Sequence, residues 1–247
     1  MLTLAFATVG AAVGSFLNLC IDRLPRGASI VTPRSSCDAC GRRLAAVDMI
    51  PVISYVALRG RCRTCHEPIP RRVLLVELAT GALFGLIHLR FGASLQGVLV
   101  CVYAAYLIVT LVIDLEHRRI LNKLTYPAIV VALAVAPFMP DRSLLQTLAG
   151  GAIGLGVLLL IALVYPGGMG MGDIKLGAFI GLAVGLPGIL LALYFSFVLG
   201  GLISGLLWLA RIIGRRDPIA FGPFLALGAL TTLLYGDPLL RWWASRG

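Results

Sequence analysis

Charged side chains are scarce in this sequence: Asp, Glu, Lys and Arg together make up 13% of its 247 residues. A soluble domain carries about 25% charged residues, so an ordinary soluble fold is excluded. A single-span receptor is excluded as well, because no large polar remainder is left outside the apolar segments. Hydrophobic residues reach 59% and the mean hydropathy is +0.96. The composition predicts an all-α, polytopic membrane protein.

The amino-terminal segment lacks two features of a removable signal peptide, a basic n-region and a clear small-residue cleavage site. We therefore interpret it as a retained span. Convincing internal repeats and low-complexity tracts are also absent from the sequence. Apolar runs near the ~20 residues that cross a bilayer predict about eight transmembrane helices, at 2–21, 73–89, 95–113, 124–139, 144–165, 174–186, 188–209 and 219–236. The fourth and sixth are short, and the glycine-rich sixth leaves open an irregular helix or fusion with its neighbour.

The basic residues predict the orientation in the membrane. The net charge is +10, and ten arginines fall in the 22–72 segment alone. Placing this loop in the cytoplasm brings to the same side Arg118, Arg119, Lys123, Lys175, Arg211, Arg215 and Arg216, and leaves on the other side Arg90, Arg142, Arg241 and Arg246. The positive-inside rule strongly prefers this arrangement, which puts both termini outside. Nucleic-acid binding is not needed to explain the charge.

Two of the few acids beside the predicted spans have matching positions. Asp114 ends the 95–113 span, and Asp173 opens the 174–186 span after the glycine-rich stretch 167–172. A charged side chain within a span costs roughly 2.5–3.5 kcal/mol on insertion scales, so each acid is a functional candidate. Two carboxylates that approach each other cannot easily both ionise, so one acts as base while the other keeps a proton. Such a pair can activate water on an amide carbonyl and protonate the leaving nitrogen, as in aspartic proteases.

Structural roles remain open for both acids. Asp114 could form an ion pair with Arg118 one helical turn later. Asp173 could cap or complement the start of a helix, with Lys175 extending to the membrane interface. The sequence alone does not separate these roles from catalysis.

Four further residues are expected to support the site. Gly170 and Gly172 allow backbone conformations and close approaches that other residues do not, and Lys175 lies three residues after Gly172. Glu77 lies deeper, within the 73–89 span, and is expected to pair with an arginine or another polar group. We assign it a supporting rather than a catalytic role.

Four of the six cysteines form two Cys-x-x-Cys pairs, Cys37/Cys40 and Cys62/Cys65, separated by 21 residues. This spacing is close to that of a four-cysteine zinc site. A cytoplasmic location disfavours disulfides, although a redox role for either pair is an alternative. Four thiolates leave no open coordination position, so the predicted zinc is structural and orders a loop that has little core of its own.

The motifs occur in a specific order along the chain: Gly14-Ser15-Phe16-Leu17-Asn18, the two cysteine pairs, Ile113-Asp114, Gly170-Met171-Gly172-Asp173-Ile174-Lys175-Leu176 and Phe221-Gly222-Pro223-Phe224. In this respect the sequence resembles the bacterial prepilin peptidases, or type IV leader peptidases, which are membrane aspartyl proteases with a Gly-x-Gly-Asp signature. One departure is Ile120-Leu121-Asn122, where that family often has a proline; it leaves the start of the fourth span open.

The resemblance implies that Asp114 and Asp173 are catalytic and that the enzyme cleaves the basic leader of type IV prepilins or pseudopilins. It places the cleavage at the cytoplasmic face of the bacterial inner membrane, and it also implies methylation of the new amino terminus with S-adenosylmethionine. The methyl transfer depends on the resemblance alone, because the sequence has no Rossmann-type glycine fingerprint. The expected partners are the prepilin or pseudopilin substrates and membrane lipid, without nucleic acid.

The expected organisation is a first span at 1–21, a cytoplasmic tetracysteine loop at 22–72 and a protease core at 73–247. The main alternative is an ion-coupled transporter, in which Asp114 and Asp173 bind protons or cations. That alternative does not by itself explain the tetracysteine loop. A peptidase without methyltransferase activity and a membrane scaffold with a zinc knuckle are further alternatives.

Overall fold

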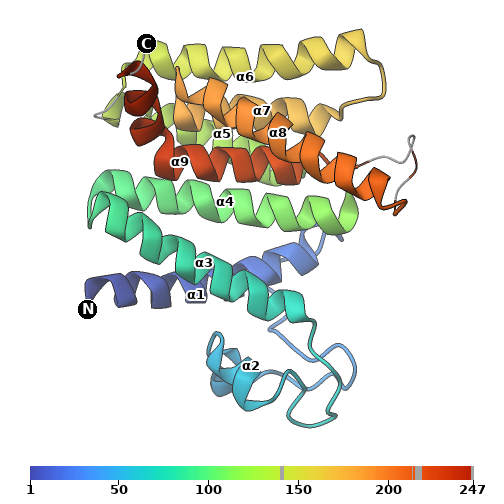
Figure 1. The fold of residues 1–247 in the computed structure, drawn as a ribbon. Coiled ribbons are helices and arrows are strands. Elements are labelled where there is room, and N and C mark those ends of the chain that lie inside the picture. Colours follow the sequence, from blue (N-terminus) through green and yellow to red (C-terminus); the bar gives the residue numbers. More distant parts are fainter. Residues whose placement is uncertain (140–141, 213, 215–218, 246–247) are drawn as a thin grey trace. The chain divides into compact units, whose positions relative to one another are not determined.

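The computed structural model describes residues 1–139, 142–212, 214 and 219–245, so Arg215, Arg216 and Arg246 of the orientation argument lie outside the described residues. Within these ranges the regular structure is helical, apart from two isolated β-bridges (Figure 1), which confirms the all-α fold. Six described helices are long and apolar enough to cross a membrane: α1 (Leu2–Arg23), α3 (Arg71–Phe91), α4 (Leu95–His117), α6 (Leu144–Val164), α8 (Gly188–Leu209) and α9 (Gly222–Ala244).

The two shortest predicted spans correspond to shorter helices. The 124–139 run forms α5 (Asn122–Val135) and the 3₁₀ turn η2 (Ala136–Phe138), and the 174–186 run forms α7 (Met171–Val184). α5 and α7 have 14 residues each, or about 21 Å at 1.5 Å per residue, which is less than the ~30 Å hydrocarbon core. α7 is a regular helix and is separated from α8 by a turn at Gly185, whose φ is +65°.

The chain divides into two compact units, Met1–Val109 and Thr110–Gly247, with the boundary inside α4. In the first unit α1 packs along α3 (Figure 1). Small residues permit the close approach: a Cβ added at Gly14 would lie 2.8 Å from the Glu77 Cα atom. Where the 22–72 segment leaves and returns to these helices, Arg72 and Asp22 form an ion pair of 2.6 Å. The segment itself contains η1 (Ala46–Met49) and α2 (Ile53–Ala57).

In the second unit α7 is the central helix and packs against α5, α6, α8 and α9. Ile174 and every residue from 176 to 183 are buried, as expected for a helix that is apolar on all sides. Its glycines contact α6 so closely that a Cβ at Gly177 or Gly181 would overlap the α6 backbone. Asp173 therefore lies at the amino-terminal end of the most enclosed helix of this unit.

The outer faces of α6 and α8 carry large, exposed apolar side chains, among them Leu160, Leu163, Leu202 and Leu206. Apolar surface on helices of membrane-spanning length is the surface that lipid covers. The helices and their exposed faces together support a multi-pass membrane protein, as the composition predicts.

Candidate active site and metal centre

Asp114 lies in the last turn of α4 and points toward the start of α9. The Arg118 backbone N–H donates to the Asp114 carbonyl oxygen at 2.8 Å, and Arg118 has a φ of +52°, which ends the helix. The Asp114 side chain is buried and accepts a hydrogen bond from the backbone of Gly222. The ion pairs among the described residues do not include Asp114 with Arg118. Its contact is thus with α9.

Asp173 is the third residue of α7 and is half-buried. Its Oδ2 atom accepts a hydrogen bond of 3.2 Å from the backbone N–H of Gly170, the residue that precedes the helix. This is the capping contact that the sequence left open as an alternative. Within the described residues this hydrogen bond occupies one of the two carboxylate oxygens of Asp173. Asp173 can therefore cap the helix and also take part in catalysis.

The second unit brings the two aspartates together. Asp114 accepts its hydrogen bond from Gly222, Asp173 directly follows Gly172, and both of these glycines pack against the same residue, Ile120. Ile120, from the connection between α4 and α5, lies between two glycines of the site. A Cβ added at Gly172 would be 2.8 Å from the Ile120 Cβ, and one added at Gly222 would be 2.5 Å from Asp114 Oδ2. The starts of α7 and α9 therefore need glycine in order to approach the end of α4.

Lys175 joins α7 to α5 beside this pair. Its Nζ atom donates to Asn122 Oδ1 at 2.9 Å and lies 5.0 Å from the centre of the Tyr126 ring. A cation over an aromatic face is attracted by the ring quadrupole. Lys175 is therefore held within the protein, and it fixes the start of α7, where Asp173 lies.

No sequence pattern marks Ile120, Asn122 or Tyr126 as residues of the site. Gly222 is indicated only as part of the segment Phe221-Gly222-Pro223-Phe224. The signal that could have identified it is a glycine directly before a proline at the start of a helix, because proline favours the first helical turn and glycine allows a close approach.

Glu77 belongs to the first unit, where it holds the tetracysteine segment. Its side chain is buried, and Oε2 accepts a 2.7 Å hydrogen bond from the backbone N–H of Val52. Val52 has a φ of +64°, which is unusual for a β-branched residue. The polar partner of Glu77 is thus a backbone amide rather than an arginine.

The four cysteines of the loop converge on one point. Their sulfur atoms all lie within 4.8 Å of one another, and the Cys37 and Cys65 sulfurs are 3.7 Å apart. Two sulfurs bound at 2.3 Å to a tetrahedral zinc are about 3.8 Å apart. Hydrogen bonds from the backbone of Cys65 and Thr64 lower the pKa of the Cys62 thiol to about 6, which favours the thiolate that a metal binds. A hydrogen bond from the Glu67 backbone acts to lower the pKa of the Cys65 thiol, but burial and the three neighbouring thiols outweigh it, so that this pKa is raised. The donor set and its spacing fit Zn²⁺.

Each cysteine pair is held by the same kind of turn. The Gly41 N–H donates to the Cys37 carbonyl at 2.9 Å, and the His66 N–H donates to the Cys62 carbonyl at 3.1 Å. Gly41 and His66 both follow the second cysteine of their pair and both have positive φ, +69° and +58°. Glycine adopts this conformation without strain, whereas histidine does not.

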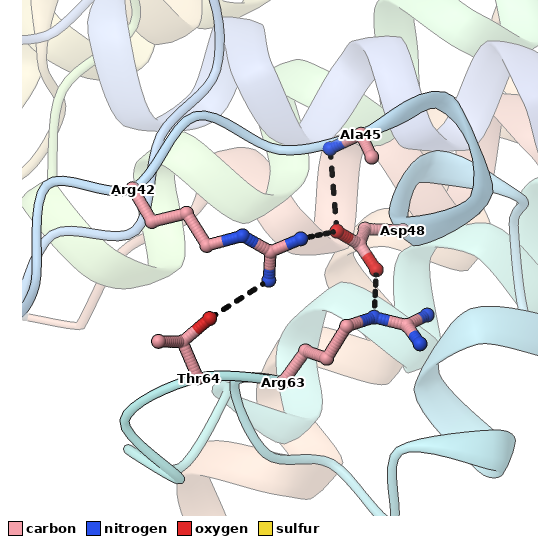
Figure 2. A network of polar contacts seen from close by, with 5 residues as sticks. All are labelled: Arg42, Ala45, Asp48, Arg63 and Thr64. Carbon is pink, nitrogen blue, oxygen red and sulfur yellow. Dashed lines mark hydrogen bonds and ion pairs between the residues drawn. The ribbon is translucent and has the colours of Figure 1, made fainter.

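Asp48 connects the two turns (Figure 2). Its carboxylate accepts hydrogen bonds from Arg42 at 2.9 Å, from Arg63 at 2.8 Å and from the backbone N–H of Ala45 at 3.2 Å. Arg42 also donates to Thr64 at 3.1 Å. The hydrogen bond from Arg63 lowers the pKa of Asp48. Asp48 was not predicted as a site residue, because no spacing or periodicity indicates that these side chains meet.

The fold and these two sites define a helical, multi-pass membrane protein that pairs two carboxylates at helix ends and carries a separate site of four thiols. Comparison with known families agrees: residues 8–91 match the Bacterial Peptidase A24 N-terminal domain, and residues 101–205 match the Type IV leader peptidase family. The chain belongs to the Type IV leader peptidase family. The four cysteines fall in the first matched range and both aspartates in the second.

Similar proteins extend over nearly the whole chain. A prepilin leader peptidase/N-methyltransferase of Bacillus subtilis (strain 168) is 33% identical over 243 residues, which cover 98% of each chain. Its namesake from Burkholderia pseudomallei (strain 1026b) is 35% identical over 269 residues, covering 95% of this chain and 86% of the relative. One from Stutzerimonas stutzeri is 31% identical over 259 residues, with 94% and 90% covered. No solved structure matches the chain.

Proposed function

We propose that this protein is a membrane aspartic endopeptidase that cleaves the basic leader of type IV prepilins or pseudopilins and then methylates the new amino terminus. The activity is that of its named relatives. The observation that supports the proposal for this chain is geometric: Asp114 lies in the last turn of α4 beside Gly222, Asp173 lies in the first turn of α7 beside Gly172, and both glycines pack against Ile120. Neither acid is neutralised by an ion pair among the described residues.

The pair supplies both halves of peptide hydrolysis. The ionised carboxylate takes a proton from a water molecule as its oxygen attacks the scissile carbonyl carbon, and a tetrahedral intermediate forms. The protonated carboxyl then donates its proton to the amide nitrogen, and the carbon–nitrogen bond breaks. Backbone N–H groups of Gly222 and Gly170 each hold one carboxylate, so that neither has to be oriented during the reaction.

The membrane arrangement follows from the substrate. The apolar amino-terminal helix of a prepilin enters the bilayer laterally, and its basic leader remains at the cytoplasmic face of the inner membrane, where anionic lipid attracts it. From the positive-inside distribution we expect the amino terminus outside, and the tetracysteine loop, Asp114 and Asp173 on that cytoplasmic face. Nucleic acid has no role in this scheme.

Zinc has a structural role in this proposal. The ion would be held by the sulfur atoms of Cys37, Cys40, Cys62 and Cys65. It would close the loop whose two cysteine turns are already connected by Asp48. Four thiolates leave no position for water, so the bound metal contributes folding free energy and takes no part in hydrolysis.

The methyl donor, S-adenosylmethionine, is a less direct part of the proposal. A cavity of about 560 Å³ in the first unit includes Arg23 and Arg34 in its lining and no carboxylate. This lining does not fit the sulfonium and ammonium charges of S-adenosylmethionine. No residue is assigned to the donor, and the methyl transfer depends on the names of the relatives.

The proposal is tested by incubating purified protein in lipid vesicles with a prepilin and S-adenosylmethionine, and by mass analysis of the pilin amino terminus. We expect a shortened chain that carries one added methyl group. A shortened, unmethylated chain establishes a peptidase without the transferase activity. An intact prepilin, together with proton or cation uptake by the vesicles, overturns the proposal in favour of a transporter.

A further inference from the structure

The cavity that does not fit a cationic methyl donor has a defined chemistry of its own. It lies in the first unit between the last turns of α1 and the segment that follows, and its volume is about 560 Å³, within the range of small-molecule sites. Apolar and cationic side chains share its wall, including Leu19, Ile30, Val31, Met49, Arg23 and Arg34. The site therefore combines two guanidinium groups with an apolar surface.

One of the two arginines of the cavity is held in place by hydrogen bonds within the protein. The Arg23 Nη1 atom donates to the Ser29 carbonyl oxygen at 2.9 Å, and the Ser29 hydroxyl accepts the backbone N–H groups of Val31 and Thr32, both at 3.2 Å. Arg34, on the same wall, has no hydrogen bond or ion pair within the described residues. One guanidinium is thus fixed in place, and the other is available to an anion.

The position of the cavity indicates where its ligand comes from. Arg23 is the last residue of α1, a helix that is long and apolar enough to span the bilayer, and Leu19 lies one turn earlier on the same helix. A guanidinium at the end of a span lies at the depth of lipid phosphates, and Leu19, one turn further into the span, lies at the depth of the first acyl carbons.

We propose that this cavity binds the phosphate of an anionic phospholipid, with the first acyl carbons of the lipid against Leu19 and Ile30. Guanidinium groups recognise phosphate through several charge-assisted hydrogen bonds. A basic leader peptide is repelled by the same two arginines. Free phosphate satisfies the arginines but leaves the apolar wall uncovered. The inference concerns the first unit alone and does not depend on the proposed peptidase activity.

The test uses full-length, zinc-loaded protein in a neutral detergent and measures the binding of fluorescent phosphatidylglycerol. Competition by unlabelled phosphatidylglycerol, phosphatidylcholine and inorganic phosphate distinguishes a lipid from a free anion. Two variants change the cavity: Arg34→Gln removes a charge, and Ala46→Phe fills the space while keeping both arginines. Arg26→Gln is the matched control, because Arg26 is exposed, carries the same charge and is not among the lining residues.

We expect Arg34→Gln to weaken phosphatidylglycerol binding by about fivefold or more, the contribution of one arginine at an anionic surface. Ala46→Phe should weaken it to a similar extent, and Arg26→Gln should leave it unchanged. Unchanged zinc content in each variant shows that the loop is still folded. The proposal is overturned by equal losses in Arg34→Gln and Arg26→Gln, by full binding in Ala46→Phe, or by equally effective competition from inorganic phosphate or phosphatidylcholine.

Discussion

Substituting Gly222 by alanine is expected to damage the active site without unfolding the protein. The added Cβ would lie 2.5 Å from Asp114 Oδ2 and 3.2 Å from Ile120 Cδ1, whereas ordinary contact begins at 3.4 Å. The Asp114 carboxylate must therefore move by about 0.9 Å, or α9 must move away from it. A misplacement of about 1 Å in a catalytic group can reduce the rate about 100-fold. This corresponds to ~2.7 kcal/mol of transition-state stabilisation.

The assay is kcat/KM for prepilin cleavage in lipid vesicles, with helical content followed by circular dichroism. Gly201→Ala and Gly205→Ala in α8 are matched controls, because an added Cβ at either position meets no atom within 4 Å. Both controls should cleave at the parental rate. Cleavage by Gly222→Ala within threefold of the parental rate would show that Asp114 tolerates this displacement and would refute the prediction.

Three further predictions concern the glycines at the start of α7 and the zinc loop. Gly172→Ala should lose more activity than Gly170→Ala, because its new Cβ would be 2.8 Å from the Ile120 Cβ, which cannot rotate away, whereas at Gly170 the nearest atom, Asp173 Oδ2, is 3.3 Å away. Asp48→Asn should speed chelator-driven zinc release and lower loop stability by about 1–2 kcal/mol, a modest value because the two arginine partners are 29% and 50% exposed. His66→Gly should slow zinc release and raise loop stability by up to about 1 kcal/mol, because it relieves a left-handed backbone.

The loop predictions share an internal control. Asp38→Asn removes the same charge as Asp48→Asn from a residue without a hydrogen bond or ion pair in the described structure, and it should leave zinc release unchanged. Equal zinc release from both variants would mean that net charge, and not the Asp48 network, controls the loop. Faster release from His66→Gly would show that the side chain of His66 contributes more than its backbone strain costs.

The long helices could be predicted from the sequence because the length of an apolar run reflects the thickness of the bilayer and needs no knowledge of tertiary contacts. α6 and α8 match their predicted ranges within one residue. The limits of α5 and α7 were harder to predict. α5 begins after Leu121, whose backbone is extended, and α7 ends just before Gly185, whose φ is +65°, so these limits depend on backbone conformation and not on hydrophobicity.

The nearness of Asp114 and Asp173 could be anticipated because one acid ends its predicted span and the other begins its span on the same predicted face of the membrane. The residues around them could not, because each of those contacts joins distant parts of the chain. Gly222 reaches Asp114 only after α9 has packed against α7, and Asn122 meets Lys175 only where α5 and α7 lie together. Asp48 is a similar case, since its two arginine partners come from different cysteine turns.

The central claim is that Asp114 and Asp173 form one catalytic pair, and prepilin cleavage by aspartate-to-asparagine variants tests it most directly. Asparagine keeps the shape of the side chain but cannot exchange a proton in the same way. We expect Asp114→Asn and Asp173→Asn each to lower kcat/KM about 1,000-fold or more. The double variant should be no slower than the worse single variant, because residues that act as a unit are not additive. Cleavage at the parental rate by either single variant would contradict the account.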